Sequence, residues 1–148
     1  MKLTGAFGNL QSLRIKSFDL GGHTFKVHVP LSKELDAMQE RMTKVNEAAA
    51  QARFETITAK FVDGVDGAVF SDNDIVVDGR SMRDLVKTIT IVENRIVEYI
   101  KLLVPAEGTL DDLTYEDIEA EFPMQVQLEL VDKISEAIQP GYKEARKN

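Results

Sequence analysis

The sequence predicts an α+β fold that is predominantly α-helical, with an N-terminal β-hairpin followed by a packed set of about four helices. Three observations predict this class: alternating apolar residues around a Gly-Gly turn, apolar residues at spacings of three and four over two long segments, and capping residues before helical segments. The 148 residues, 43% of them hydrophobic, suit one domain of ordinary size. We expect a single domain over residues 1–148, with residues 1–12 and 140–148 flexible.

The predicted hairpin occupies residues 13–29. Two short stretches alternate apolar with polar residues, a period that places the apolar side chains on one face of a strand. The apolar positions are Leu13, Ile15, Phe25, Val27 and Val29. Between the stretches, Gly21 and Gly22 supply the positive φ of a tight turn. A small second hairpin is expected near residues 68–77.

The clearest helical pattern begins at Ser32, a good N-cap residue, and continues to Val62, which predicts one long helix. Its apolar residues follow at alternating spacings of three and four, as in an a/d seam. The seam comprises Leu35, Met38, Met42, Val45, Ala49 and Ala52. It either packs on another helix of the domain or meets a partner in part, where unbranched methionine adapts well. The candidate partner contacts are Leu35, Met38, Met42 and Val45.

Three further helices follow. The most apolar is predicted over residues 82–104, and we place it at the centre of the core. Its stripe comprises Leu85, Ile89, Val92, Ile96, Ile100 and Leu103. A short acidic helix, capped by Thr109 or Thr114, ends near Phe122. Pro123 then occupies the first position of the last helix.

Charge is distributed unevenly along the chain. The net charge is −7, but residues 1–62 carry +3 and residues 63–148 carry −10. Residues 102–132 include nine Asp and Glu and no Lys or Arg. Such a surface repels nucleic acid and anionic lipid, and it attracts a basic protein segment. We therefore expect a protein partner, with no nucleic acid and no membrane.

The short acidic helix offers a second candidate surface. Tyr115, Ile118 and Phe122 form one stripe, and acidic residues surround it. The stripe either faces the core, as in an ordinary amphipathic helix, or lines an acidic cradle for a basic amphipathic helix of a partner. The candidate contacts there are Tyr115, Glu116, Asp117 and Glu119.

The sequence predicts no catalytic residue, no cofactor and no metal ion. It has no cysteine, and its two histidines, His23 and His28, have no neighbour at a metal-ligand spacing. The aspartates of residues 63–78 match no EF-hand frame and are good turn residues. No glycine-rich phosphate loop and no nucleophile elbow occurs. With no apolar signal region and no stretch long enough to cross a bilayer, we expect an intracellular protein.

The order of these segments resembles that of the tail assembly chaperones of long, non-contractile-tailed bacteriophages. The resemblance rests on a hairpin leading to LSKEL at residues 31–35, a central apolar helix, and TLDDLTYEDIE at residues 109–119 before a final helix. It implies a non-enzymatic chaperone that binds the helical tape-measure protein and holds it soluble during tail assembly, with tail-tube subunits as further candidate partners. It also implies a place in the host cell cytoplasm and absence from the finished virion.

Other interpretations stay open. A structural phage component, such as a head–tail connector or tail-completion protein, is the alternative, and it would remain in the virion. A small enzyme with an unrecognised site is the least favoured, and homo-oligomer formation is compatible with the seam. A holdase for an apolar chain needs an adaptable apolar patch and a strong net charge, and the composition suits both.

Overall fold

The computed structural model describes residues 1–140. The expectation that the C-terminal tail is flexible concerns residues 141–148 as well, and these lie outside the described residues. The fold is α+β and mainly helical, as predicted, with one two-stranded and one three-stranded sheet among these residues. The chain forms two compact units: unit 1 comprises residues 1–39 and those from Ile96 onward, and unit 2 comprises Glu40–Arg95. The single domain stays a prediction.

Unit 1 contains the predicted hairpin, β1 (Ile15–Leu20) and β2 (His23–His28), which pair in antiparallel register. Gly21 and Gly22 have φ values of 59° and 79°, so the strands are joined by the tight glycine turn that the sequence predicts. Before the hairpin lie a short helix α1 (Leu3–Phe7) and a 3-10 turn (Gln11–Arg14).

The outer edge of β2 is covered by the segment that follows helix α4 (Met82–Ile100). The His28 N–H donates to the Leu102 carbonyl at 2.8 Å, and the Val104 N–H donates to the Lys26 carbonyl at 2.8 Å. A helix continuing to Val104 was therefore a wrong prediction: these residues leave the helix and satisfy the backbone groups of an edge strand.

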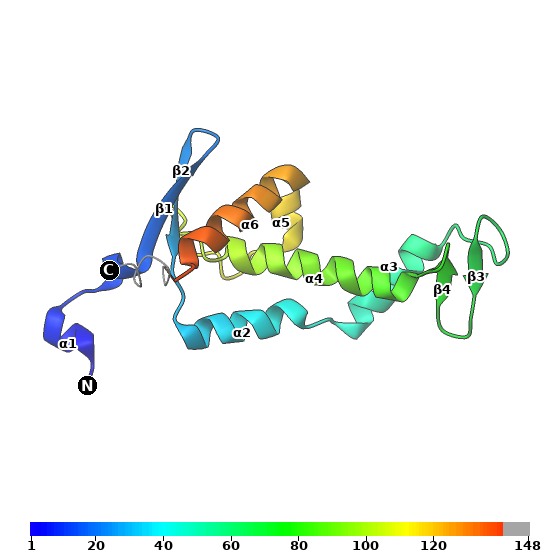
Figure 1. Ribbon diagram of the computed structural model, residues 1–148, viewed down its shortest axis with the longest axis horizontal. Helices are drawn as coiled ribbons and strands as arrows, with labels where there is room; N and C mark the ends of the chain where they lie inside the picture. Colours follow the sequence, from blue (N-terminus) through cyan, green and yellow to red (C-terminus); the bar gives the residue numbers. More distant parts are fainter. Residues whose placement is uncertain (141–148) are drawn as a thin grey trace, which may run out of the picture. The chain divides into compact units, whose positions relative to one another are not determined.

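Helices α5 (Tyr115–Glu119) and α6 (Met124–Ile138) complete unit 1. Of the two threonines that could cap α5, Thr114 does so, in a reciprocal capping box with Asp117. Pro123 lies at the N-cap position of α6, one residue earlier than predicted. Helix α6 packs against both strands of the hairpin (Figure 1). Its buried residues are Gln127, Leu130, Val131 and Ile134.

The predicted long helix over residues 33–62 is two helices, α2 (Ser32–Thr43) and α3 (Glu47–Thr58), so that prediction was wrong. Asn46 has extended backbone angles (φ −77°, ψ 117°), and its side chain accepts the Ala49 N–H at 3.0 Å. An asparagine in this position starts a new helix because its short side chain satisfies a backbone donor that the first turn leaves open. The amide of Asn94 then donates to the carbonyls of Met42 at 3.2 Å and Lys44 at 2.9 Å.

The break also changes which residues of α3 are buried. Ala49 and Ala52, the predicted end of the a/d seam, are exposed. The break shifts the phase of the helix, so Phe54 becomes buried instead. In unit 2 the core cluster consists of Phe54, Ile75, Met82 and Val86, with Ala50, Ile57, Phe61, Val77 and Leu85 packed against it.

The predicted second hairpin is present and gains a strand. β3 (Ala68–Phe70), β4 (Ile75–Val77) and β5 (Arg80–Ser81) form an antiparallel sheet in that order. Asp78 and Gly79, with φ values of 50° and 81°, make the turn between β4 and β5.

Candidate functional site

The methionines of the a/d seam are buried. Met38 is 2% exposed and Met42 is 8% exposed, while Leu35 and Val45 are half-buried. The burial of the methionines favours the interpretation of the seam as core packing, which the sequence also admitted. A contact of these four residues with a partner stays a prediction, and it would require the methionines to be uncovered first.

The four candidates on α5 divide into two pairs. The Tyr115 hydroxyl donates to Oε1 of buried Gln127 at 2.9 Å, and Asp117 accepts the Thr114 N–H at 3.0 Å. These two residues therefore have structural contacts of their own. Glu116 and Glu119 are exposed, so their carboxylates are available to a partner.

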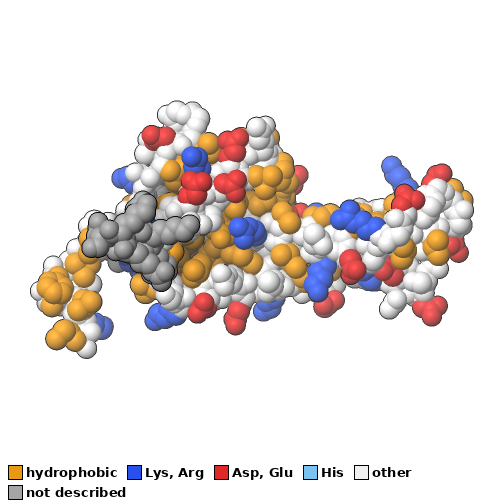
Figure 2. All heavy atoms as spheres, viewed as in Figure 1, with side chains coloured by type: hydrophobic (Ala, Val, Ile, Leu, Met, Phe, Trp, Pro, Cys, Tyr) orange, Lys and Arg blue, Asp and Glu red, His pale blue; other side chains and the backbone are white. Residues whose placement is uncertain are grey.

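A surface that was not predicted from the sequence lies on α6. Met124 and Leu128 are 49% and 47% exposed, and Asp132 continues the same line at four-residue spacing. Exposed Glu129 lies beside them, with its Oε1 3.4 Å from the amide of Gln125. We call Met124, Gln125, Leu128, Glu129 and Asp132 the α6 face. Figure 2 shows acidic and hydrophobic side chains next to one another over this helix.

The α6 face has a sequence signal that could have revealed it. The core stripe of this helix includes Leu130 and Ile134, and both are fully buried. Met124 and Leu128 form a second apolar pair, four residues apart, that lies outside this stripe. The face also belongs to residues 102–132, the segment without Lys or Arg, so its acidic character extends along the chain.

Unit 2 has an exposed apolar group of its own, consisting of Val62, Val65, Val69 and Phe70, each at least 40% exposed. The loop before β3 covers the outer edge of that strand: Phe70 N–H donates to Asp63 Oδ1 at 3.0 Å, and Gly64 N–H donates to the Ala68 carbonyl at 2.8 Å. The side chains of this group are therefore exposed, while the backbone groups at the edge of β3 have hydrogen-bond partners. Residues 61–79 contain five aspartates and no Lys or Arg, so this group is also surrounded by acids.

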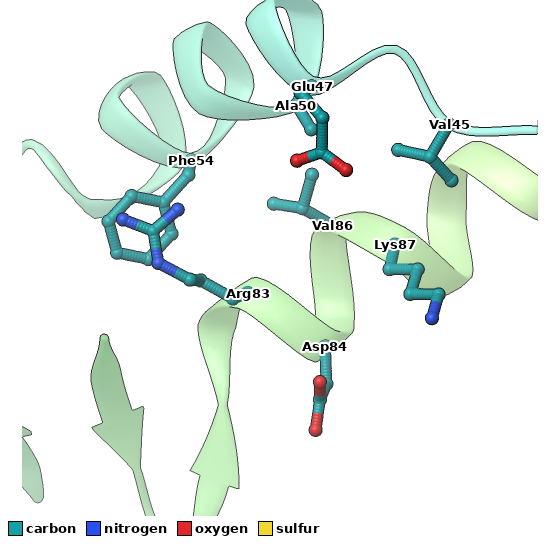
Figure 3. A pocket seen from close by; sticks show the side chains of 8 residues that line it. All are labelled: Val45, Glu47, Ala50, Phe54, Arg83, Asp84, Val86 and Lys87. Atoms are coloured by element: carbon teal, nitrogen blue, oxygen red, sulfur yellow. The ribbon is translucent and has the colours of Figure 1, made fainter. Parts of the chain in front are cut away.

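Between α3 and the start of α4, unit 2 also holds an open pocket of about 210 Å³. The Arg83 guanidinium lies 4.0 Å above the centre of the Phe54 ring, donates to Gln51 Oε1 at 2.8 Å, and also donates to the Asn73 carbonyl. Figure 3 shows this stacking, with the Asp84 carboxylate pointing away from α3. These contacts hold the two helices together and assemble no nucleophile and base. The residues that line the pocket are Val45, Glu47, Ala50, Phe54, Arg83, Asp84, Val86 and Lys87.

Asp74 organises the start of α4. Its Oδ1 accepts the N–H groups of Ile75 at 2.7 Å and Arg83 at 3.2 Å, and its Oδ2 accepts the Ser81 hydroxyl. Burial by itself would raise the pKa of this carboxyl, but the hydrogen bonds from Ser81, Ile75 and Arg83 outweigh it and hold the pKa below its usual value. Ser81 in turn accepts the Asp84 N–H at 3.1 Å. The carboxylate is thus used for structure.

Two further kinds of feature, a metal centre and a membrane-spanning helix, are absent from residues 1–140. Within residues 1–140, no three His, Cys, Asp or Glu side chains come together in a way that could hold a metal ion. His23 contacts the edge of the Phe25 ring, with 4.6 Å between centroids, and His28 is half-buried in β2. In the same part of the chain, no helix combines the length and the apolar character needed to cross a bilayer.

Comparison with known proteins adds no relative to this picture. No protein-family model, no curated protein and no solved structure matches the chain.

Proposed function

We propose that this chain is a non-enzymatic chaperone that binds a helical phage protein, the tape measure, and keeps it soluble during tail assembly in the host cytoplasm. The observation that carries the proposal is the α6 face, where Met124 and Leu128 are exposed among carboxylates in a segment without Lys or Arg. The phage context comes from the resemblance in segment order.

The chemistry of the α6 face fits an amphipathic helix with basic flanks. The side chains of Met124 and Leu128 offer apolar area to the apolar stripe of such a helix. The carboxylates of Glu129 and Asp132 attract Lys and Arg beside that stripe, which raises the association rate and disfavours acidic competitors.

The exposed apolar group of unit 2, with Val69 and Phe70, has the same combination of apolar side chains and aspartates. A long helical chain offers several segments, so two surfaces on one chaperone can bind one partner at two points. Linking two weak contacts in this way increases the overall affinity without enlarging either contact.

The test is co-expression with the tape-measure protein encoded in the same phage genome. We expect the soluble fraction of the tape measure to rise with the wild-type chaperone and to fall again with the variant Met124→Ser/Leu128→Ser. Val92→Ser, which alters a 40% exposed residue outside both surfaces, is the matched control. A tape measure that stays insoluble with the wild-type chain would refute the proposal.

Mass spectrometry of purified virions separates this function from the alternative. A head–tail connector or tail-completion protein remains in the particle, whereas a chaperone that acts before tube assembly leaves it. We expect no peptide of this chain in virions and abundant peptides in the lysate of infected cells. Stoichiometric recovery from virions would establish the structural alternative instead.

A further inference from the structure

The N-terminal segment of the chain has the same chemistry as the partner that the α6 face is suited to bind. Residues 1–13 contain one charged side chain, that of Lys2, and no Asp or Glu. In the described part of the chain, nothing buries any residue of α1. We call residues 1–13 the arm.

The arm is strongly apolar and uncovered. Leu3 and Phe7 are 57% and 72% exposed, and Leu13 is 77% exposed. Leu3 and Phe7 are four residues apart in α1, so they lie on the same side of the helix. Figure 2 shows hydrophobic side chains gathered over α1. Apolar side chains grouped in this way on an otherwise polar surface commonly mark a site of protein contact.

The α6 face matches the arm in both geometry and charge. It also presents two apolar side chains four residues apart, Met124 and Leu128, so one helical turn of the arm can pack on one turn of α6. Its carboxylates, Glu129 and Asp132, are opposite in sign to Lys2, the one charged side chain of the arm. The two surfaces are exposed in the same molecule, so the arm is not seated on the α6 face of its own chain.

We propose that the arm of one copy docks, through Leu3 and Phe7, on the α6 face of a second copy of this chain. Because arm and face are different surfaces, each copy offers one of each. The contact therefore either closes into a ring or a reciprocal dimer, or it extends into an open chain. This self-association does not depend on the proposed function, since it requires no other protein.

Sedimentation velocity of the pure, full-length chain tests the proposal. The contact is small, so association is expected over concentrations of about 10 µM to about 1 mM. We expect the mean mass to rise with concentration and the association to weaken when salt is raised from about 0.05 M to about 0.5 M, because exposed charges are screened. A chain that stays monomeric over this range overturns the proposal, as does an arm that binds its own chain without concentration dependence.

Two variants identify the surfaces. Leu3→Ser/Phe7→Ser removes the arm contacts, and Met124→Ser/Leu128→Ser removes the face contacts. All four residues are exposed, so both variants are expected to keep the wild-type circular dichroism. Each is expected to weaken association at least about tenfold, which corresponds to about 1.4 kcal/mol. The control Val92→Ser, at a residue of α4 that is 40% exposed and lies outside both surfaces, is expected to associate like the wild type.

A mixture of the two variants provides the decisive measurement. The arm variant retains an intact α6 face, and the face variant retains an intact arm, so one copy of each can still form a single contact. We expect the equimolar mixture to form a dimer and nothing larger, although each variant alone is monomeric. A mixture that remains monomeric, or variants that associate as the wild type does, would show that another surface is responsible.

Discussion

Arg53 and Glu93 form a bidentate ion pair that joins α3 to α4 within unit 2. Arg53 Nη1 donates to Glu93 Oε1 at 2.9 Å, and Nη2 donates to Oε2 at 2.7 Å. The arginine side chain is 38% exposed and the glutamate 18% exposed, so solvent screens the pair only in part. The planar guanidinium matches the two carboxylate oxygens in a way that the lysine ammonium cannot.

Glu93→Gln is therefore expected to lower the free energy of unfolding by about 1 kcal/mol, because a charge-assisted pair that is partly exposed contributes an amount of this order. Urea unfolding followed by circular dichroism measures the change. Glu40→Gln, at an exposed position of α2, is the control and should leave the midpoint unchanged. An equal effect of the two substitutions would contradict a specific role of the pair.

The contact of Asn94 with the residues between α2 and α3 gives a second prediction. Its amide donates hydrogen bonds to the carbonyls of Met42 and Lys44, which have no intrahelical partners at the end of α2. Asn94→Ala is expected to destabilise the chain by about 1–2 kcal/mol, since two carbonyls lose a donor. Hydrogen exchange should show faster exchange at residues 44–50 than in the wild type, whereas Thr88→Ala, at an exposed position of the same helix, should leave this segment unchanged.

Asp74 predicts a specific dependence of stability on pH. Its pKa is lowered in the folded state, so its contribution to stability is complete above the unfolded-state pKa of about 3.9 and is lost as the pH falls through the lower folded-state value. Unfolding experiments between about pH 2 and pH 7 should therefore show a steeper loss of stability below about pH 4 in the wild type than in Asp74→Asn. Identical pH profiles would refute the role of the carboxylate.

At neutral pH, Asp74→Asn is also expected to reduce stability by about 1–3 kcal/mol, because an amide satisfies the Ser81, Ile75 and Arg83 donors less well than a carboxylate. Asp72→Asn changes an exposed aspartate of the same loop and serves as the control. We expect its unfolding midpoint to match that of the wild type.

The two exposed apolar surfaces each give a prediction for partner binding. Met124→Ser/Leu128→Ser and Val69→Ser/Phe70→Ser are each expected to weaken binding of the tape measure about tenfold or more, since each removes apolar area from the contact. Surface plasmon resonance with immobilised tape-measure segments measures this. Because the altered residues are exposed, the free energy of unfolding of each variant should stay within about 0.5 kcal/mol of the wild-type value.

The outcome separates the two surfaces. If only the α6 variant loses affinity, the partner contacts unit 1 alone, and the two-point mode of binding is wrong while the proposed function stands. If neither variant differs from Val92→Ser, the exposed apolar side chains do not bind the partner, and the basis of the proposed function is removed.

The local elements of this protein could be predicted from the sequence because their causes are local. Gly21 and Gly22 allow the positive φ of a tight turn, and Thr114 and Asp117 cap each other within four residues. The alternating residues on either side of the glycines form the two strands. Such features depend on neighbours in the chain, so the fold class and both hairpins were predicted correctly.

The break between α2 and α3 has a local cause, the Asn46 cap, and a second cause that only tertiary structure supplies. The spacing of three and four continues through Val45, so the local pattern favours one helix. The carbonyls at the end of α2 instead bind Asn94, which lies 50 residues away from Lys44. Only the fold brings that amide to the helix end, and a pattern of apolar spacing contains no information about such a donor.

Tertiary structure also decided which residues form the candidate binding surface. Met38 and Leu128 are both apolar residues in amphipathic helices, yet one is 2% exposed and the other 47%. The sequence determines that each helix has an apolar side, because apolar residues that recur with the helical period of 3.6 residues line up on one side. Which apolar residues remain outside depends on how much of that side the hairpin and the other helices cover, and this covering exists only once the chain has folded.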